Sequence, residues 1–275
     1  MPPGIRTDAL AVTPSGRTIW TTDSSATTIT AHRIRDLQRG RSIDVGGAPI
    51  AIAIAPDAPT ALVLTAFYDR PALAIVDLVA GEVTRLKVGP DPRAVAFTRS
   101  GKAAYVAGGD GTLTKVDPYA RRVHDPVKVG AQPRDVVVTS AGVLVALNGE
   151  AAVALVKGTS VRKIATADYP HQVAAAGARA LVTHSGAGAR RVSLLDLERR
   201  RVTRRLNAGL EPAGVAVAGT RAVVTAGGSG KVAVFDLRTG RRRSRAIGGR
   251  PRAVAIAGTR AIVADGVTGQ LTKVR

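Results

Sequence analysis

The chain has 275 residues, 45% of them hydrophobic, which is enough to bury a core in one large domain or two smaller ones. It carries 40 lysines and arginines against 20 aspartates and glutamates, a formal net charge of +20, so it should attract polyanions at low salt. It has no cysteine, which excludes disulfides and thiolate sites. Its first residues do not resemble a signal peptide and no apolar run is long enough to cross a membrane, so we expect no transmembrane segment.

A short motif recurs along the chain: a proline that follows a glycine-containing step and precedes alternating apolar residues. It occurs at intervals of 37 to 43 residues. The segment 8–12 lies one interval before the first proline and opens an equivalent unit. The sequence therefore predicts seven units. They start near residues 8, 49, 92, 133, 170, 212 and 251.

Each unit predicts four strands in the same order. The first is rich in valine, isoleucine and small residues, and it is expected at 51–54, 94–97, 135–138, 214–217 and 253–256. A glycine turn then leads to a second run, as at 104–107, which makes a hairpin. The third run ends in an aspartate and the fourth is strongly basic. The recurring aspartates precede turns, which they should cap; they are Asp77, Asp117, Asp196 and Asp236.

Four-stranded units at this spacing, with no helical periodicity, indicate an all-β, seven-bladed propeller of antiparallel blades covering residues 1–275 as a single domain. A leucine-rich solenoid would need shorter units, and a β-sandwich gives no reason for a repeated proline loop. The last unit has only three clear strands, ending at 271–275. We expect residues 4–6 to supply its outer strand and to close the ring.

Two segments resemble the repeat of the bacterial YVTN family. In residues 105–117 and 224–236, a Tyr-Val-Thr-Asn-like strand, a glycine turn and a Val-x-Asp strand follow one another, although no unit keeps the full Tyr-Val-Thr-Asn. The resemblance covers nearly all of the chain and includes lactonase-like seven-bladed propellers. It implies this architecture and favours an extracytoplasmic location, but it does not imply one activity.

The loops entering the first strands of a propeller gather at one mouth of its axis, so the residue after each proline is a candidate for a site. In chain order these residues are Asp8, Ile50, Arg93, Arg134, His171, Ala213 and Arg252. The three arginines suit a carboxylate or phosphate. The alternative is that they pair with aspartates or carbonyls and only satisfy loop ends.

Counting along the hairpins adds second-strand residues to this predicted ligand site. A turn at 177–178 pairs residue 171 with 184, so His171 should face His184, and the same count places Arg252 opposite Asp265. Equivalent positions give Asp23 and Asn148. The two histidines offer a metal or acid–base option, but no third ligand is evident, so no metal or cofactor is predicted.

Two basic runs fall on the outer strands of neighbouring units. They contain Arg199, Arg200, Arg201, Arg204, Arg205, Arg241, Arg242 and Arg243. This rim could bind nucleic acid or anionic lipid, or its charge could protect exposed strand edges from pairing with other chains. We favour edge protection, because only 3% of residues are aromatic and few bases could stack. The arginine excess could also reflect compositional bias.

These observations favour a non-enzymatic, monomeric binding propeller that recognises an anionic small molecule or an acidic protein segment at its mouth. The alternatives are a propeller lyase or hydrolase working from His171 and His184, and nucleic-acid binding through the rim. No serine–histidine–aspartate or paired-carboxylate pattern supports catalysis, so no catalytic residue is predicted.

Overall fold

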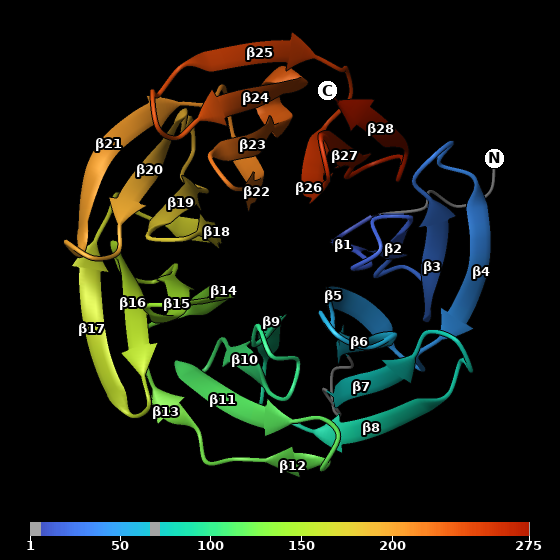
Figure 1. The fold of residues 1–275 in the computed structure, drawn as a ribbon. Helices are drawn as coiled ribbons and strands as arrows, with labels where there is room; N and C mark the ends of the chain where they lie inside the picture. Colours follow the sequence, from blue (N-terminus) through green and yellow to red (C-terminus); the bar gives the residue numbers. More distant parts are fainter. Residues whose placement is uncertain (1–6, 67–71, 275) are drawn as a thin grey trace.

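A computed structural model describes residues 7–66 and 72–274, which form seven antiparallel sheets arranged as the blades of a ring (Figure 1). The predicted all-β, seven-bladed propeller is confirmed. The one helical segment among these residues is a 3₁₀ turn at Gly227–Ser229, and none of them forms a helix that is long and apolar enough to cross a membrane.

The strands of each blade run in chain order from the axis outwards. The innermost strands are β1 (Leu10–Val12), β5 (Ala48–Ile54), β9 (Pro92–Phe97), β14 (Pro133–Thr139), β18 (Pro170–Ala176), β22 (Pro212–Ala218) and β26 (Pro251–Ala257). The second strands are β2 (Thr18–Thr22), β6 (Thr60–Ala66), β10 (Ala104–Gly108), β15 (Gly142–Leu147), β19 (Arg179–His184), β23 (Arg221–Ala226) and β27 (Arg260–Asp265).

The third strands are β3 (Thr28–Arg33), β7 (Ala72–Asp77), β11 (Thr112–Asp117), β16 (Ala152–Lys157), β20 (Arg191–Asp196), β24 (Lys231–Asp236) and β28 (Leu271–Val274). The outer strands are β4 (Arg39–Asp44), β8 (Val83–Lys87), β17 (Ser160–Ala165), β21 (Arg201–Asn207) and β25 (Arg242–Ala246). In the third blade this position is divided into β12 (Arg122–Val123) and β13 (Val127–Lys128), which both pair with β11. Pro126 lies between them and cannot donate to the ladder.

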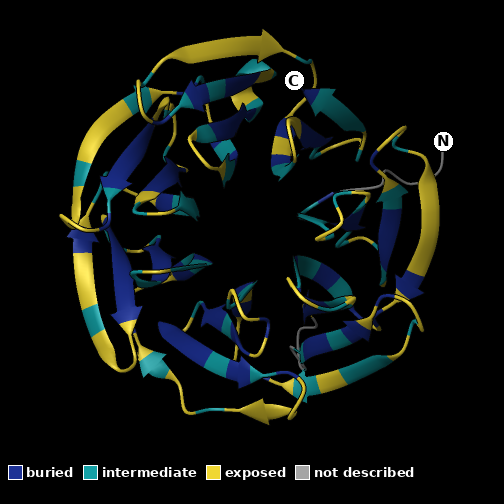
Figure 2. Ribbon diagram, in the orientation of Figure 1, coloured by how far each residue is buried: buried dark blue, intermediate teal, exposed yellow. Residues whose placement is uncertain are grey.

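The hydrophobic core is divided into seven layers, each between two consecutive blades. Successive side chains of a strand point to opposite faces, so one strand serves two layers. On β6, Ala61 and Val63 pack towards the first blade, while Leu62 and Leu64 pack towards the third. Figure 2 shows the result: the middle strands are buried and the outer strands are exposed. Each blade is therefore stabilised mainly by its neighbours.

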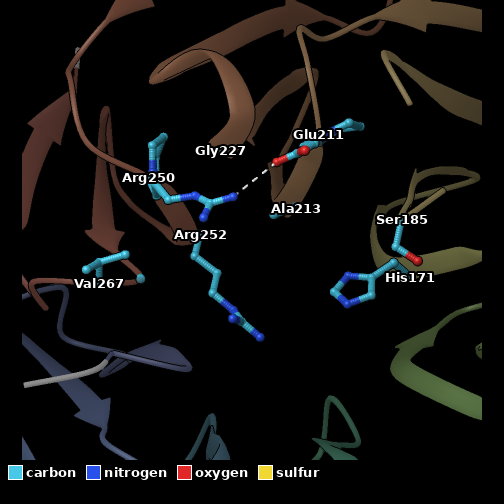
Figure 3. A pocket seen from close by; sticks show the side chains of 11 residues that line it. His171, Ser185, Glu211, Ala213, Gly227, Arg250, Arg252 and Val267 are labelled. Carbon is cyan, nitrogen blue, oxygen red and sulfur yellow. Dashed lines mark hydrogen bonds and ion pairs between the residues drawn. The ribbon is translucent and has the colours of Figure 1, made fainter. Parts of the chain in front are cut away.

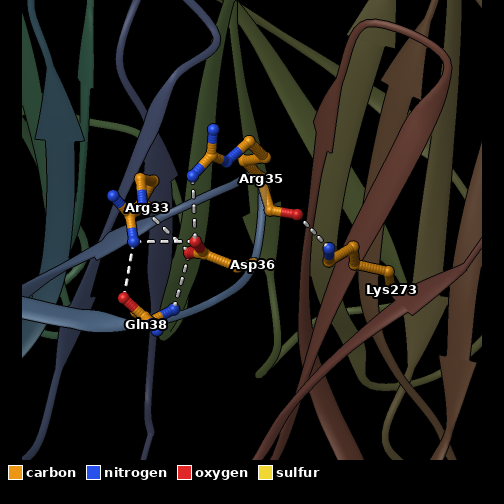
Figure 4. Close-up of polar contacts among 5 residues, drawn as sticks. All are labelled: Arg33, Arg35, Asp36, Gln38 and Lys273. Atoms are coloured by element: carbon orange, nitrogen blue, oxygen red, sulfur yellow. Dashed lines mark hydrogen bonds and ion pairs between the residues drawn. The ribbon is translucent and has the colours of Figure 1, made fainter.

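The last blade packs directly against the first. Ile262 of β27 is fully buried with Ile19 and Ile34. At the periphery, Lys273 Nζ of β28 donates to the carbonyl oxygen of Arg35 at 2.5 Å (Figure 4). The residues expected to add an outer strand to this blade, 4–6, lie outside the described part of the chain. Within that part the last blade has three strands.

Candidate functional site

A cavity of about 210 Å³ lies where the inner strands begin, and all seven blades contribute to its wall. The residues that follow the repeated prolines converge on this cavity, as the sequence predicted. The lining residues are Asp8, Ile50, Arg93, Arg134, His171, Gln172, Ala213 and Arg252. We call this space the axial cavity.

A β-bulge after each repeated proline places these side chains in the axial cavity. In β18, Pro170 pairs with His184 and Val173 with Val182, so two residues stand opposite one. The same extra residue follows the proline in the other five proline-containing blades. A bulged residue has no cross-strand partner and its side chain can be re-aimed. The chain therefore presents the residue after the proline to the axis rather than to the hairpin.

The loops that enter the inner strands are held in a repeated backbone conformation. The residue before the proline has a positive φ of 50° to 54° in four blades, at Asp91, Gln132, Tyr169 and Glu211. The carbonyl of each accepts a hydrogen bond from the loop after the second strand, as in Gly109 N to Asp91 O at 2.8 Å. Left-handed residues other than glycine are uncommon and need such support. The mouth is thus built on fixed loops.

The bulge makes the predicted pairing of His171 with His184 wrong. Pro170, not His171, stands opposite His184. His184 is only 4% exposed, its Nδ1 lies 3.0 Å from the carbonyl oxygen of Asp168, and its Nε2 lies 2.9 Å from Ser193 Oγ. Burial lowers the pKa of His184 below its ordinary value. Its contacts are those of a structural residue.

The predicted ion pair between Arg252 and Asp265 is wrong for the same reason, because Asp265 pairs with Pro251. The Asp265 carboxylate accepts from the backbone nitrogens of Arg250, Val267 and Thr268 at 2.6 to 2.9 Å. It closes its own turn, and the guanidinium of Arg252 extends into the space between the blades (Figure 3).

The other two second-strand residues are also outside the axial cavity. Asn148 links neighbouring blades, since its Nδ2 donates to the Pro170 carbonyl at 3.1 Å and to Ser185 Oγ at 3.3 Å. Asp23 accepts from Ser25 N at 2.9 Å and lines a separate cavity between the first and last blades. Both residues organise loops around the mouth.

The positive charge of the axial cavity is only partly neutralised. Arg93 forms a two-point ion pair with Asp91, with both nitrogen–oxygen distances 2.7 Å. Arg134 and Arg252 have no carboxylate within ion-pair distance among the described residues. Burial lowers the pKa of Arg134, and the charges of Arg93 and Arg252 lower it further. These two arginines are the strongest candidates for holding an anion.

His171 lies among these charges as a neutral ring. Burial is the main cause that lowers its pKa to about 4, and Arg134 and Arg252 add to the effect. Its Nδ1 is buried without a hydrogen-bond partner among the described residues. An unpaired buried polar atom costs free energy, so this ring is held beside the axial cavity at the expense of one unsatisfied nitrogen.

We expect His171 to titrate near pH 4 in an NMR pH series, and added phosphate to raise that value because an anion stabilises the imidazolium. Zinc should leave both His171 and His184 unchanged, because the two rings do not face one another. A shared response of the two histidines to zinc would contradict this geometry. The variants His171→Gln and His184→Gln assign the two signals, because each removes one imidazole from the spectrum.

Two polar residues of the inner strands escaped the sequence reasoning. Asp135 Oδ2 accepts from the backbone nitrogen of Val173 in the next blade at 2.8 Å, and burial raises the pKa of this carboxyl to about 7. Gln172 repeats the arrangement one blade further, with its Oε1 3.3 Å from Val215 N. In both blades the sequence has a polar residue two positions after the repeated proline, and this pattern could have identified them. These side chains connect blades directly beside the mouth.

A second cavity of about 370 Å³ adjoins the axial cavity and shares His171, Ala213 and Arg252 with it (Figure 3). We call it the side cavity. An ion pair between Arg250 and Glu211, 3.5 Å apart, lies on its wall. Gly266 borders the side chain of Arg252, since a Cβ atom there would lie 2.9 Å from Arg252 Cβ and Cδ. Arg252 thus stands between the two cavities.

Turn capping is confirmed for three of the four recurring aspartates. Asp77, Asp196 and Asp236 each accept two backbone nitrogens of the following turn at 2.7 to 3.0 Å. Asp117 instead contacts His124 Nε2 at 2.6 Å. Within the described ranges, no cluster of three or more histidines or carboxylates could hold a metal ion.

No protein-family model and no curated protein matches the sequence. Among solved structures, the chain is similar to a chain of Kuenenia stuttgartiensis hydrazine synthase, with a TM-score of 0.85 and 18% sequence identity, over 99% of this chain and 96% of the other. At this identity the likeness shows the propeller fold alone.

Proposed function

We propose that the protein is a non-enzymatic binding propeller whose axial cavity holds the anionic group of a small molecule or of an acidic protein segment. The observation that carries this proposal is the pair Arg134 and Arg252, which line one cavity without a carboxylate partner among the described residues. Two guanidinium groups that line one cavity without a direct ion-pair partner cost free energy, and a bound anion would reduce that cost.

The neighbouring groups support an anion rather than a cation. His171 is neutral near pH 7 and can donate or accept a hydrogen bond, according to its tautomer. Asp8, the carboxylate of the axial cavity, already accepts from Ser24 N at 2.9 Å. The side cavity leaves room for the remainder of a ligand.

The enzyme alternative, a lyase or hydrolase, loses its paired histidines because His184 is buried away from His171. Membership of the YVTN-repeat family, and the extracytoplasmic location that it would imply, are part of this proposal and rest on the two segments 105–117 and 224–236.

Inorganic phosphate is the simplest probe of the axial cavity. We expect phosphate, at constant ionic strength, to raise the Tm of the protein in proportion to ln(1 + [phosphate]/Kd) and to give a saturable signal in titration calorimetry. The variant Arg252→Gln should weaken phosphate binding roughly tenfold or more, since a charge-assisted hydrogen bond contributes about 1.5 to 3 kcal/mol. The exposed residue Arg162 of β17 provides the matched control, Arg162→Gln. Equal losses in the two variants would reject the proposed site.

A further inference from the structure

The outer edges of the fifth and sixth blades carry a concentration of arginine that the axial cavity does not use. We call residues 199–205 and 238–245 the basic rim. It contains ten arginines, all exposed: Arg199, Arg200, Arg201, Arg204, Arg205, Arg238, Arg241, Arg242, Arg243 and Arg245. From residue 196 to 207 and from 236 to 246, the acidic residues are Asp196, Glu198 and Asp236.

The nearby carboxylates leave most of this charge uncompensated. Asp196 and Asp236 are occupied by the backbone nitrogens of their own turns. Within the described part of the chain, the ion pair formed by the basic rim is Arg199 with Asp196, at 3.2 Å. Arg204 donates to a backbone carbonyl, and the other eight arginines of the basic rim are available to a partner.

Protection of strand edges does not account for this excess. The outer strands β4, β8 and β17 each carry two cationic residues, and some of these are engaged, since Lys163 pairs with Glu150 at 2.6 Å and Arg85 donates to the Val45 carbonyl. The strands β21 and β25 each carry three, with more in the turns before them. Two cationic residues are enough to protect the outer strands of other blades, so the basic rim has more arginines than edge protection requires.

The two outer strands form one surface. Arg204 Nη1 of β21 donates to the Thr239 carbonyl of the sixth blade at 3.2 Å, and Arg179 Nη1 donates to the Leu237 carbonyl at 3.2 Å. These contacts fix the edges of the fifth and sixth blades to one another. In Figures 1 and 2, β21 and β25 follow each other around the periphery, and both are largely exposed. An elongated partner could therefore contact both strands at once.

The residue types of the basic rim indicate which class of polyanion it can bind. It has no aromatic residue on which a single-stranded base could stack, and none of the exposed large hydrophobic residues belongs to it. It therefore lacks the apolar anchor of a protein that inserts into a bilayer. Guanidinium groups bind phosphate oxygens at two points, and alternate residues of a strand repeat every ~6.6 Å along one face. This composition suits regularly spaced phosphates on a rigid scaffold.

We propose that the basic rim binds double-stranded nucleic acid through its phosphates, without reading the sequence. Contacts of this kind release counterions, so the affinity falls with salt by about 0.9 in log Kd per log salt for each phosphate contacted. This proposal concerns the outer wall of the propeller and is independent of the axial cavity.

The test compares two variants that lose four charges each, in fluorescence anisotropy with a labelled duplex of about 20 base pairs at several salt concentrations. The rim variant is Arg201→Gln, Arg205→Gln, Arg243→Gln and Arg245→Gln. The control variant removes one exposed cation from the outer strand of each of the first four blades: Arg39→Gln, Lys87→Gln, Arg122→Gln and Arg162→Gln. Far-ultraviolet circular dichroism and Tm verify that both variants fold.

We expect the rim variant to weaken duplex binding at least tenfold at moderate salt and to reduce the salt slope by about 3 to 4, and the control to change affinity by less than about threefold. Equal losses in both variants would overturn the proposal, because total charge alone would then explain binding. It would also be overturned if single strands bound as tightly as the duplex, if the wild type bound no duplex at low salt, or if only binding to phosphatidylserine vesicles depended on the basic rim.

Discussion

Replacing Arg134 and Arg252 together by glutamine should abolish phosphate binding at the mouth and raise the Tm of the protein without ligand. Each guanidinium is expected to contribute about 1.5 to 3 kcal/mol to binding, so the double variant should lose roughly a hundredfold in affinity or more. The opposite effect on Tm follows because Arg252 and Arg93 already lower the pKa of Arg134, which means that the charges repel one another in the folded state. Removing such strain at a binding site commonly stabilises a protein by about 0.5 to 2 kcal/mol.

The matched control is Arg122→Gln with Arg162→Gln, which removes the same charge from the exposed outer strands β12 and β17. Calorimetric titration with phosphate and thermal unfolding, both at low salt, give the two readouts. A double mouth variant that unfolds at a lower temperature than the wild type would mean that the two arginines hold the loops together and are not kept for a ligand.

The second large effect concerns the pH dependence of stability, to which Asp135 and His171 contribute with opposite signs. The pKa of Asp135 rises from 3.8 to about 7 on folding, so its contribution is fully present below 3.8 and is lost as the pH rises through 7. The pKa of His171 falls from 6.5 to about 4, so its contribution is present above 6.5 and is lost as the pH falls through 4. Between these limits the two contributions largely offset one another.

The variant Asp135→Asn should therefore expose the dependence due to His171, and its free energy of unfolding should increase by about 2 to 3 kcal/mol between pH 4 and pH 7. The variant His171→Gln should show the reverse slope. Asparagine can accept only one of the two backbone hydrogen bonds from Val136 and Val173, so Asp135→Asn should also lose about 1 to 3 kcal/mol at every pH. Urea unfolding over this range measures both effects, and parallel curves for wild type and Asp135→Asn would contradict the assignment.

The sequence was sufficient to predict the fold because several features of the repeat indicate the same structural unit. The proline step, the hairpin turn and the aspartate turn recur in register, and each points to the same four-stranded unit. The inner strands β5, β9, β14, β18, β22 and β26 begin within one residue of the predicted starts of their units, which is two or three residues before the first strands that were predicted in five of these units. The divided outer strand of the third blade was not foreseen, although Pro126 was visible in the sequence.

The candidate site was predicted only in part, and one extra residue per blade explains the difference. Hairpin counting is correct from the turn back to Val173, which pairs with Val182, and fails beyond it. A bulge depends on the fit between the loop before Pro170 and the strand that follows, and not on a residue type that marks it. The residues after the prolines were found because their position relative to the axis does not depend on pairing, whereas His184 and Asp265 were selected through pairing and were misplaced.

The unpaired position after each proline also makes this ring a scaffold for protein engineering. The backbone ladder of each blade pairs on both sides of that residue and leaves it unpaired, so we expect exchanges of Arg93, Arg134, Ala213 or Arg252 to leave the strand register unchanged. A combinatorial library at these positions would vary the recognition chemistry of the mouth one blade at a time on an unchanged backbone. Selectivity can thus be evolved here separately from foldability.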